Sequence, residues 1–226
     1  MKNNGNKIKE FLKKEWPALA ILLASLVITL ILYPRLPDRI PMHWNIAGEV
    51  DRYGSRLEGA FMLPLLSIAL YAFYHLLPII DPKRKNYSKF NSSYTFLRYL
   101  LLLFFLGMQI IVLTTSLGLA LDVGRWVTGG VGLLFILLGN IMSRFRFNYF
   151  VGVRTPWTLA SEEVWRKTHL LASKLMVIGG LICLLGVFPS SNELRFTLVM
   201  LGALVPSGIS VLYSYLVYRK LEVDND

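Results

Sequence analysis

Apolar residues gather into six long blocks along the chain instead of recurring at the period of a surface helix or strand. Each block is close to the roughly 20 residues that a helix needs to cross the core of a bilayer. Lipid offers no water to backbone polar groups, so such blocks favour helices, whose hydrogen bonds close internally. The blocks cover residues 16–33, 60–80, 97–121, 126–142, 170–188 and 196–218.

The composition agrees with this pattern, because 54% of the 226 residues are hydrophobic and only 17% are charged. We therefore predict an all-α integral membrane protein: a six-helix transmembrane bundle that forms a single membrane domain over residues 1–226. The net charge of +10 comes from basic residues in the connections between blocks. That placement indicates contact with membrane lipids and argues against direct binding of nucleic acid.

The basic residues are unevenly divided between the two sides that six spans define. The amino-terminal segment, the connections after the second and fourth spans and the carboxy-terminal segment hold 18 of the 24 Lys and Arg residues. Because Lys and Arg accumulate in cytoplasmic connections, this bias predicts a multi-pass protein of the cell membrane with both termini in the cytoplasm. Residues 34–59 then form an extracellular loop, and residues 143–169 form a cytoplasmic loop.

The loop 34–59 is rich in residues with fixed backbone preferences. Pro37 and Pro41 favour an extended chain, and Gly48 and Gly54 mark turns. They predict a short rigid hairpin or hooked loop that presents polar side chains from a defined scaffold. The candidate ligand-binding residues of this loop are His43, Trp44, Asn45, Gly48 and Asp51.

Two interpretations of these polar residues stay open. His43 and Asp51 carry groups that bind metal ions, although a structural zinc site normally has four ligands. Alternatively, His43 and Asn45 bond to the loop backbone, and Asp51 caps a turn or pairs with a neighbouring arginine. Trp44 would then lie at the membrane interface.

The loop 143–169 ends in a predicted helix start. Pro156 pushes Thr155 into an extended conformation. Ser161 is a capping residue, and Glu162 and Glu163 follow it at the positive end of the helix dipole. Apolar residues then recur every three or four positions, so we expect a helix that begins at the surface and continues into the fifth span.

This loop also concentrates residue types that dominate binding hot spots. A candidate pocket for a cytoplasmic partner or an anionic group consists of Arg154, Trp157, Trp165 and His169. The alternative is an interfacial helix in which the tryptophans are membrane anchors and Arg154 pairs with Glu162, Glu163 or a lipid phosphate. The candidate partner-binding or structural residues of the loop are Asn148, Arg154, Thr155, Pro156, Trp157, Ser161, Trp165 and His169.

The two loops carry two motifs in a fixed order. The first reads Leu36-Pro37, Ile40-Pro41-Met42-His43-Trp44-Asn45, Gly48, Asp51 and Gly54, and the second reads Asn148, Gly152-Val153-Arg154-Thr155-Pro156-Trp157-Thr158-Leu159, Ser161, Val164-Trp165 and Thr168-His169. Together they resemble the SdpI family of bacterial membrane proteins, and the resemblance covers essentially the whole chain. It implies protection against a secreted antimicrobial peptide toxin, together with signalling to a cytoplasmic transcriptional regulator.

Two other classes of function are weighed beside this one. A metal-dependent membrane enzyme would use His43, Asn45 and Asp51, but the predicted topology puts His169 across the bilayer from that site. A small transporter would need a polar path, for which Gln109, Asn140 and Lys174 are the candidates. We favour the immunity or sensing protein over an enzyme, and we expect no cofactor.

Overall fold

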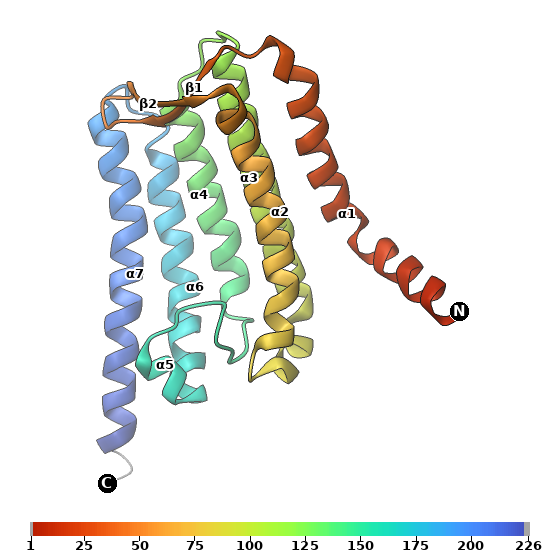
Figure 1. Ribbon diagram of the computed structural model, residues 1–226. Coiled ribbons are helices and arrows are strands. Elements are labelled where there is room, and N and C mark those ends of the chain that lie inside the picture. Colours follow the sequence, from red (N-terminus) through yellow and green to blue (C-terminus); the bar gives the residue numbers. More distant parts are fainter. Residues whose placement is uncertain (1, 224–226) are drawn as a thin grey trace. The chain divides into compact units, whose positions relative to one another are not determined.

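The computed structural model describes residues 2–223, and this part of the chain is mostly helical (Figure 1). Six of its helices are long and apolar enough to cross a membrane. They are α1 (Lys2–Leu32), α2 (Arg56–Ile80), α3 (Asn91–Ser116), α4 (Val123–Met142), α6 (Glu162–Leu185) and α7 (Asn192–Val223). The predicted all-α membrane fold is confirmed.

Shorter elements join these helices. They are the 3-10 helix η1 (Tyr33–Arg35), the strands β1 (Arg39–Trp44) and β2 (Val50–Ser55), the 3-10 helix η2 (Arg84–Phe90) and the short helix α5 (Pro156–Ala160). The two strands pair with each other as one antiparallel hairpin. Both long loops of the sequence are therefore structured, as predicted.

The helices overlap all six apolar blocks, but their ends differ from those of the blocks. Helix α1 begins at Lys2, because the polar residues before Trp16 are helical as well. Helix α3 stops at Ser116, where Gly118 takes a φ of +85° and Leu119 N–H donates to the Thr114 carbonyl, a Schellman ending. The assignment of residues 1–226 to a single membrane domain stays a prediction.

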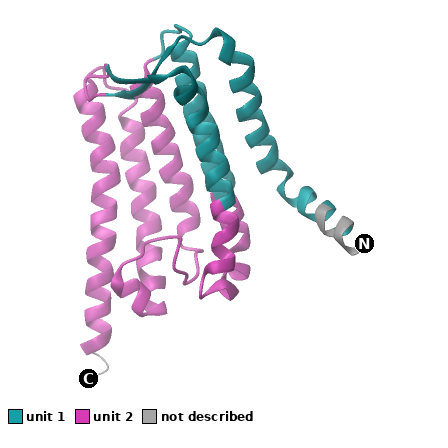
Figure 2. Cartoon of the chain, in the orientation of Figure 1, with its two compact units in different colours: residues 1–44, 50–72, 98–121 teal, residues 45–49, 73–97, 122–226 magenta. Residues whose placement is uncertain are grey.

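The chain falls into two compact units (Figure 2). Unit 1 comprises the chain up to Trp44, Val50–Ala72 and Arg98–Leu121, and unit 2 comprises Asn45–Glu49, Phe73–Leu97 and the chain from Asp122 onward. Helices α2 and α3 contribute to both units. Unit 1 thus contains α1 and the hairpin strands, and unit 2 contains the hairpin turn, the loop 143–169 and helices α4 to α7.

Polar side chains join α1 to α3 within unit 1. The buried Gln109 amide donates to the Ser25 carbonyl at 2.9 Å and to the Thr29 hydroxyl at 2.6 Å, and the Ser25 hydroxyl donates back to Gln109. Closer to the amino end of α1, Arg98 forms an ion pair with Glu15 at 3.0 Å, and both side chains are buried. Because lipid cannot satisfy such groups, these contacts hold α1 against α3.

Unit 2 is organised around α6, which packs against α4 on one side and α7 on the other. Two adjacent glycines make these approaches close. A Cβ on Gly180 would lie 2.6 Å from the Gly132 carbonyl of α4, and a Cβ on Gly179 would collide with the Gly202 carbonyl of α7. Small residues at helix crossings let backbones come close, which is how helices associate in lipid.

Substituting Gly179 tests this packing. Alanine favours a helix over glycine by about 1 kcal/mol, but its Cβ has no room against α7. We expect Gly179→Ala to lower the free energy of unfolding by about 1–3 kcal/mol. The measurement is thermal unfolding in detergent, followed by the reaction of a thiol dye with the buried Cys183.

Gly208→Ala is the matched control, because nothing lies within 4 Å of a Cβ built on Gly208 in α7. It should leave the unfolding midpoint unchanged or raise it. If Gly179→Ala shifts the midpoint in the same direction as Gly208→Ala, the close packing of α6 against α7 contributes nothing to stability.

Candidate functional site

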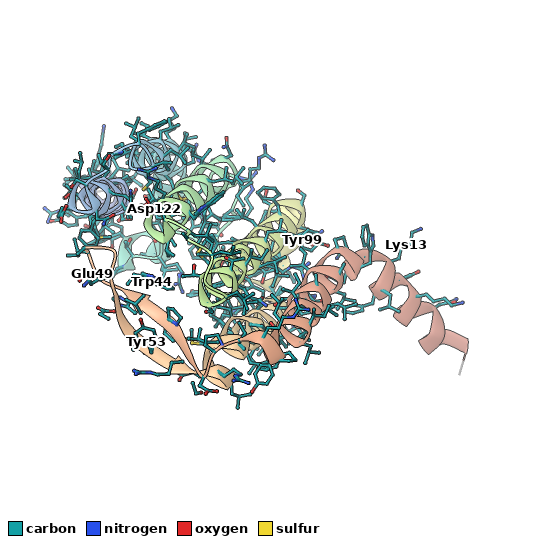
Figure 3. The ribbon with its side chains drawn as sticks, turned by 90° about the horizontal axis from the view of Figure 1, so that it is seen from above. Lys13, Trp44, Glu49, Tyr53, Tyr99 and Asp122 are labelled. Atoms are coloured by element: carbon teal, nitrogen blue, oxygen red, sulfur yellow. The ribbon has the colours of Figure 1, made fainter. Side chains whose placement is uncertain are left out.

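The loop 34–59 is an antiparallel hairpin whose base is anchored in the core of unit 1. Arg39 pairs with Ser55 and Pro41 with Tyr53, and the register shifts on both sides of His43. Leu36 and Ile40 are buried in one apolar cluster with Ala60 and Leu113, which fixes the first strand. Figure 3 shows Trp44 and Tyr53 on the two strands of this hairpin.

The turn of the hairpin is built by two of the predicted residues. The Asn45 side-chain oxygen accepts from Glu49 N–H at 3.0 Å, while the Asn45 backbone N–H donates to the Glu49 carbonyl at 2.9 Å. Gly48 takes a φ of +80°, which favours glycine, and its N–H donates to the Asn45 carbonyl at 2.9 Å. Asn45 and Gly48 therefore shape the turn.

His43 and Asp51 lie side by side across the hairpin. His43 Nδ1 is 2.6 Å from Asp51 Oδ1, and both side chains are exposed. This is the proximity that a shared metal or ligand site would need. Among residues 2–223 the structure shows no group of three or more His, Cys, Asp or Glu side chains that could hold a metal ion.

Polar contacts tie the hairpin turn to the start of α7 within unit 2. The Asn192 amide donates to the Ala47 carbonyl at 2.6 Å, and the Asn192 oxygen accepts from Arg195 Nη1 at 2.7 Å. The buried Arg195 also binds both carboxylate oxygens of Asp122, at 3.0 and 3.2 Å. Asp122 in turn caps α4 by accepting from Arg125 N–H at 3.0 Å. The turn is therefore held by a charged network.

The loop 143–169 is built around Asn148, which is fully buried. Its amide donates to the carbonyls of Arg146 and Val151 at 2.9 and 3.0 Å. Its oxygen accepts from the N–H groups of Phe150 and Val151 at 2.9 and 2.7 Å. One side chain thus satisfies several polar groups of a buried, irregular backbone segment.

The end of α2 and the segment η2 hold this loop in place. The buried Asp81 accepts from Tyr87 O–H and from Tyr149 N–H, each at 3.0 Å. The Asn86 amide donates to the Phe147 carbonyl at 2.9 Å. Because these bonds bridge distant parts of the sequence, the loop is rigid.

Trp165 and His169 of α6 lie beneath the loop and pack against it. Their rings stack with centroids 4.0 Å apart, and both side chains are almost completely buried. Trp165 Nε1 donates to the Phe145 carbonyl at 2.9 Å. His169 Nε2 accepts from Val153 N–H at 3.0 Å, and its Nδ1 lies 2.8 Å from the Trp165 carbonyl. This pattern requires a neutral imidazole with its proton on Nδ1.

Gly152 explains how His169 can come so close to the backbone. Its φ is +114°, and a Cβ there would collide with His169 Nε2. Only glycine therefore lets the chain turn over the imidazole and direct Val153 N–H at it.

The predicted helix start at Ser161 is present after this turn, and a second helix start, which was not predicted, precedes it at Thr155. Thr155 caps α5 by accepting from Thr158 N–H at 3.1 Å, with Pro156 in the first turn, and Ser161 caps α6. The Thr155 hydroxyl also lies 2.9 Å from the Ser214 hydroxyl of α7. Trp157 packs on Tyr215 of α7, with ring centroids 5.0 Å apart.

The structure thus separates the four residues of the candidate pocket. Trp165 and His169 are internal, whereas Trp157 is half-buried and Arg154 is exposed. Glu163 pairs with Lys167 at 2.7 Å, while Arg154 Nη1 donates to the Tyr149 carbonyl at 3.3 Å. Asn148, Trp165 and His169 therefore build the loop, and Arg154 and Trp157 remain at its surface.

A cavity of about 300 Å³ lies beside Arg154, between the loop and helices α4, α6 and α7. Gly152, Val153 and Thr155 form its edge on the loop. The hairpin turn lies at the opposite end of these helices, near the starts of α4 and α7 (Figure 1). Since α4 has 20 residues, about 30 Å separates the two ends.

Comparisons with known proteins extend over both loops. The chain is 30% identical to Immunity protein SdpI of Bacillus subtilis (strain 168) over 210 residues, which cover 93% of this chain and 98% of that protein. The chain belongs to the SdpI family. No solved structure matches it.

Two family models match the chain, and each of them covers one of the two loops. Residues 20–68 match a domain of unknown function, DUF1648, and residues 144–214 match the SdpI/YfhL protein family. A further relative is the uncharacterized membrane protein YbgB of Bacillus subtilis (strain 168), which is 33% identical over 46 residues, or 20% of this chain and 50% of YbgB. The first region contains the hairpin, and the second contains α6 and nearly all of the loop 143–169.

The sequence did not predict several of the residues that hold these loops in place. The sequence does indicate a role for Asp81, because a carboxylate directly after an apolar span and before a proline needs hydrogen-bond donors nearby. Asp122, Asn192 and Arg195 stand in short connections, where charged residues usually face solvent, so their pairing was visible only in the structure.

Substituting His169 tests how the second loop of this SdpI-family chain is held. Leucine cannot accept from Val153 N–H, and an unsatisfied buried donor costs about 1–3 kcal/mol. His169→Leu should lower the free energy of unfolding by that amount, measured by the Cys183 dye assay.

Lys167→Gln, which breaks the half-exposed pair with Glu163, is the control and should change the stability far less than His169→Leu does. Equal stability of His169→Leu and the wild type would show that the bond to Val153 does not hold the loop.

Proposed function

We propose that this protein is a membrane immunity protein that protects its producer from a secreted, membrane-active peptide. The observation that carries the proposal is the match to Immunity protein SdpI, which extends over nearly the full length of both chains. The rigid, partly exposed hairpin adds a surface that could meet such a peptide.

The proposal includes an orientation in the membrane. The bias of 18 to 6 in Lys and Arg supports a cytoplasmic location for both termini and for the loop 143–169. Arg98 counts among the 18 but is buried against Glu15, and leaving it out barely changes the bias. The hairpin then faces the outside, where a secreted peptide arrives.

The hairpin surface suits an amphipathic peptide. Ile46 in the turn is 52% exposed, and Tyr53 on the second strand is 47% exposed with the Arg39 guanidinium 5.1 Å from its ring centre. Tyrosine and arginine are enriched at binding hot spots, and the exposed Ile46 adds apolar area for contact. Because Asn192 already holds the turn, little conformational entropy is lost when a peptide binds.

The proposal also gives the loop 143–169 a contact with a cytoplasmic regulator. Tyr149, Arg154 and Trp157 expose part of their side chains there, while the residues beneath them are buried. Crosslinking from Arg154→Cys in native membranes, followed by identification of the captured protein, addresses this part of the proposal.

Labelling of single cysteines tests the orientation. In a Cys183→Ala background, Ile46→Cys should react with a membrane-impermeant maleimide in intact cells. Arg144→Cys, at the other end of α4, should react only after permeabilisation. The reverse pattern would place the hairpin in the cytoplasm and remove it from contact with a secreted peptide.

Survival under peptide challenge tests the function. Expression of the wild-type chain in a sensitive host should raise the concentration of the producer's secreted peptides that is needed to kill the cells. Ile46→Ser should reduce that protection about fivefold, because truncating an interface residue that contributes to binding costs about 1 kcal/mol.

Leu119→Ser is the matched control, since Leu119 is a similarly exposed apolar residue in a connecting loop outside the hairpin. Immunoblots of membranes should show equal amounts of both variants. Unchanged survival with the wild-type chain, across all peptides secreted by the producer, would contradict the proposed function.

A further inference from the structure

The cavity beside Arg154 lies between helices that cross the membrane. Phe135 of α4, Met176 of α6 and Pro206 of α7 supply apolar walls. Its volume of about 300 Å³ is at the lower end of the range for ligand pockets, which suits part of a molecule such as one acyl chain.

The cavity opens sideways along α7. Ser207 and Val211 line it and are exposed, and α7 is one of the helices of membrane-crossing length. The exposed face of such a helix meets lipid, not water. A lipid chain can therefore enter from the bilayer, whereas a water-soluble ligand has no comparable path along this side.

The edge of the cavity is positively charged. Arg154 lines it, and none of the described carboxylates pairs with this arginine. The Ser207 and Ser210 hydroxyls already donate to helix carbonyls at 2.7 Å each. The guanidinium is thus the strong donor at this edge, and it calls for an anionic oxygen such as a phosphate.

The backbone beneath Arg154 is held in a fixed position. His169 binds Val153 N–H on one side, and Thr155 caps α5 and contacts Ser214 on the other. Arg154, whose Nη1 donates to the Tyr149 carbonyl at 3.3 Å, therefore lines the apolar cavity from a fixed backbone position. A cation at the level of the headgroups, with an apolar slot beside it, complements an amphiphile that has an anionic head and an apolar chain.

We propose that this cavity binds an anionic phospholipid, with the phosphate on Arg154 and one acyl chain between α4 and α7. The assignment is independent of the immunity function, because it requires only that α4, α6 and α7 lie in a membrane. The bound lipid fills the space between α4 and α7 and secures the edge of the loop 143–169.

Native mass spectrometry of the full-length protein in detergent tests the assignment. The probes are phosphatidylglycerol and phosphatidylcholine with identical acyl chains. The wild type should bind phosphatidylglycerol about fivefold more tightly, since one basic residue near the surface contributes that much for an anionic lipid.

Arg154→Gln should abolish the preference, because it weakens binding of phosphatidylglycerol more than that of phosphatidylcholine, whose choline already offsets the phosphate charge. Ala203→Leu, which fills the cavity from α7, should weaken binding of both lipids. Arg144→Gln, an exposed arginine outside the cavity, and Gly208→Leu, at an open position of α7, are the matched controls and should bind as the wild type does.

Three results would overturn the assignment. The first is an undiminished preference for phosphatidylglycerol in Arg154→Gln. The second is displacement of the lipid by inorganic phosphate, which would mean that the acyl chain is not held. The third is that Arg154→Gln and Ala203→Leu both bind lipid as the wild type does but no longer protect cells from the peptide. That result would make the cavity a peptide site.

Discussion

The constraint on which this structure depends is that polar groups placed among membrane-crossing helices must find partners within the protein. Gln109 bonds to Ser25 and Thr29, and Arg98 pairs with Glu15, so that α3 holds α1. The same constraint explains why these residues are buried although they are polar or charged. Their partners come from another helix, so satisfying them also fixes how the helices pack.

The two loops satisfy the constraint in different ways. The hairpin satisfies its backbone by strand pairing, and its turn is held by the charged network of Asn192, Arg195 and Asp122. The loop 143–169 has no strand partner, so side chains that include Asn148, Asp81 and His169 bond to its backbone. Both loops are rigid as a result, and rigid surfaces lose less entropy when they bind a partner.

The sequence predicted what local patterns determine. Six apolar blocks gave six long helices, and Pro37, Pro41 and Gly48 indicated the hairpin. The cap at Ser161 followed from the residue types at helix starts. Each of these features depends on residues close together in the chain.

The candidate site was harder to predict because burial depends on distant contacts. Trp165 and His169 have the residue types of a binding site, yet they are buried and bond to the backbone of Phe145 and Val153. Nothing local distinguishes an exposed tryptophan from one that donates to a carbonyl 20 residues away. The cavity was equally invisible, because it is formed by three helices that meet only in the folded chain.

Helix α7 is the element that contacts both loops within unit 2. Asn192 at its start bonds to the hairpin turn, and Ser214 lies against Thr155 of the other loop. These residues are 22 positions apart, or about 33 Å along a helix. Helix α4 runs beside this stretch of α7: Asp122 at its start binds Arg195 of α7, and Met142 at its end lines the same cavity as Ser210 of α7. These helices therefore connect the hairpin turn to the opposite loop, and their glycine contacts with α6 would have to accommodate any movement transmitted along them.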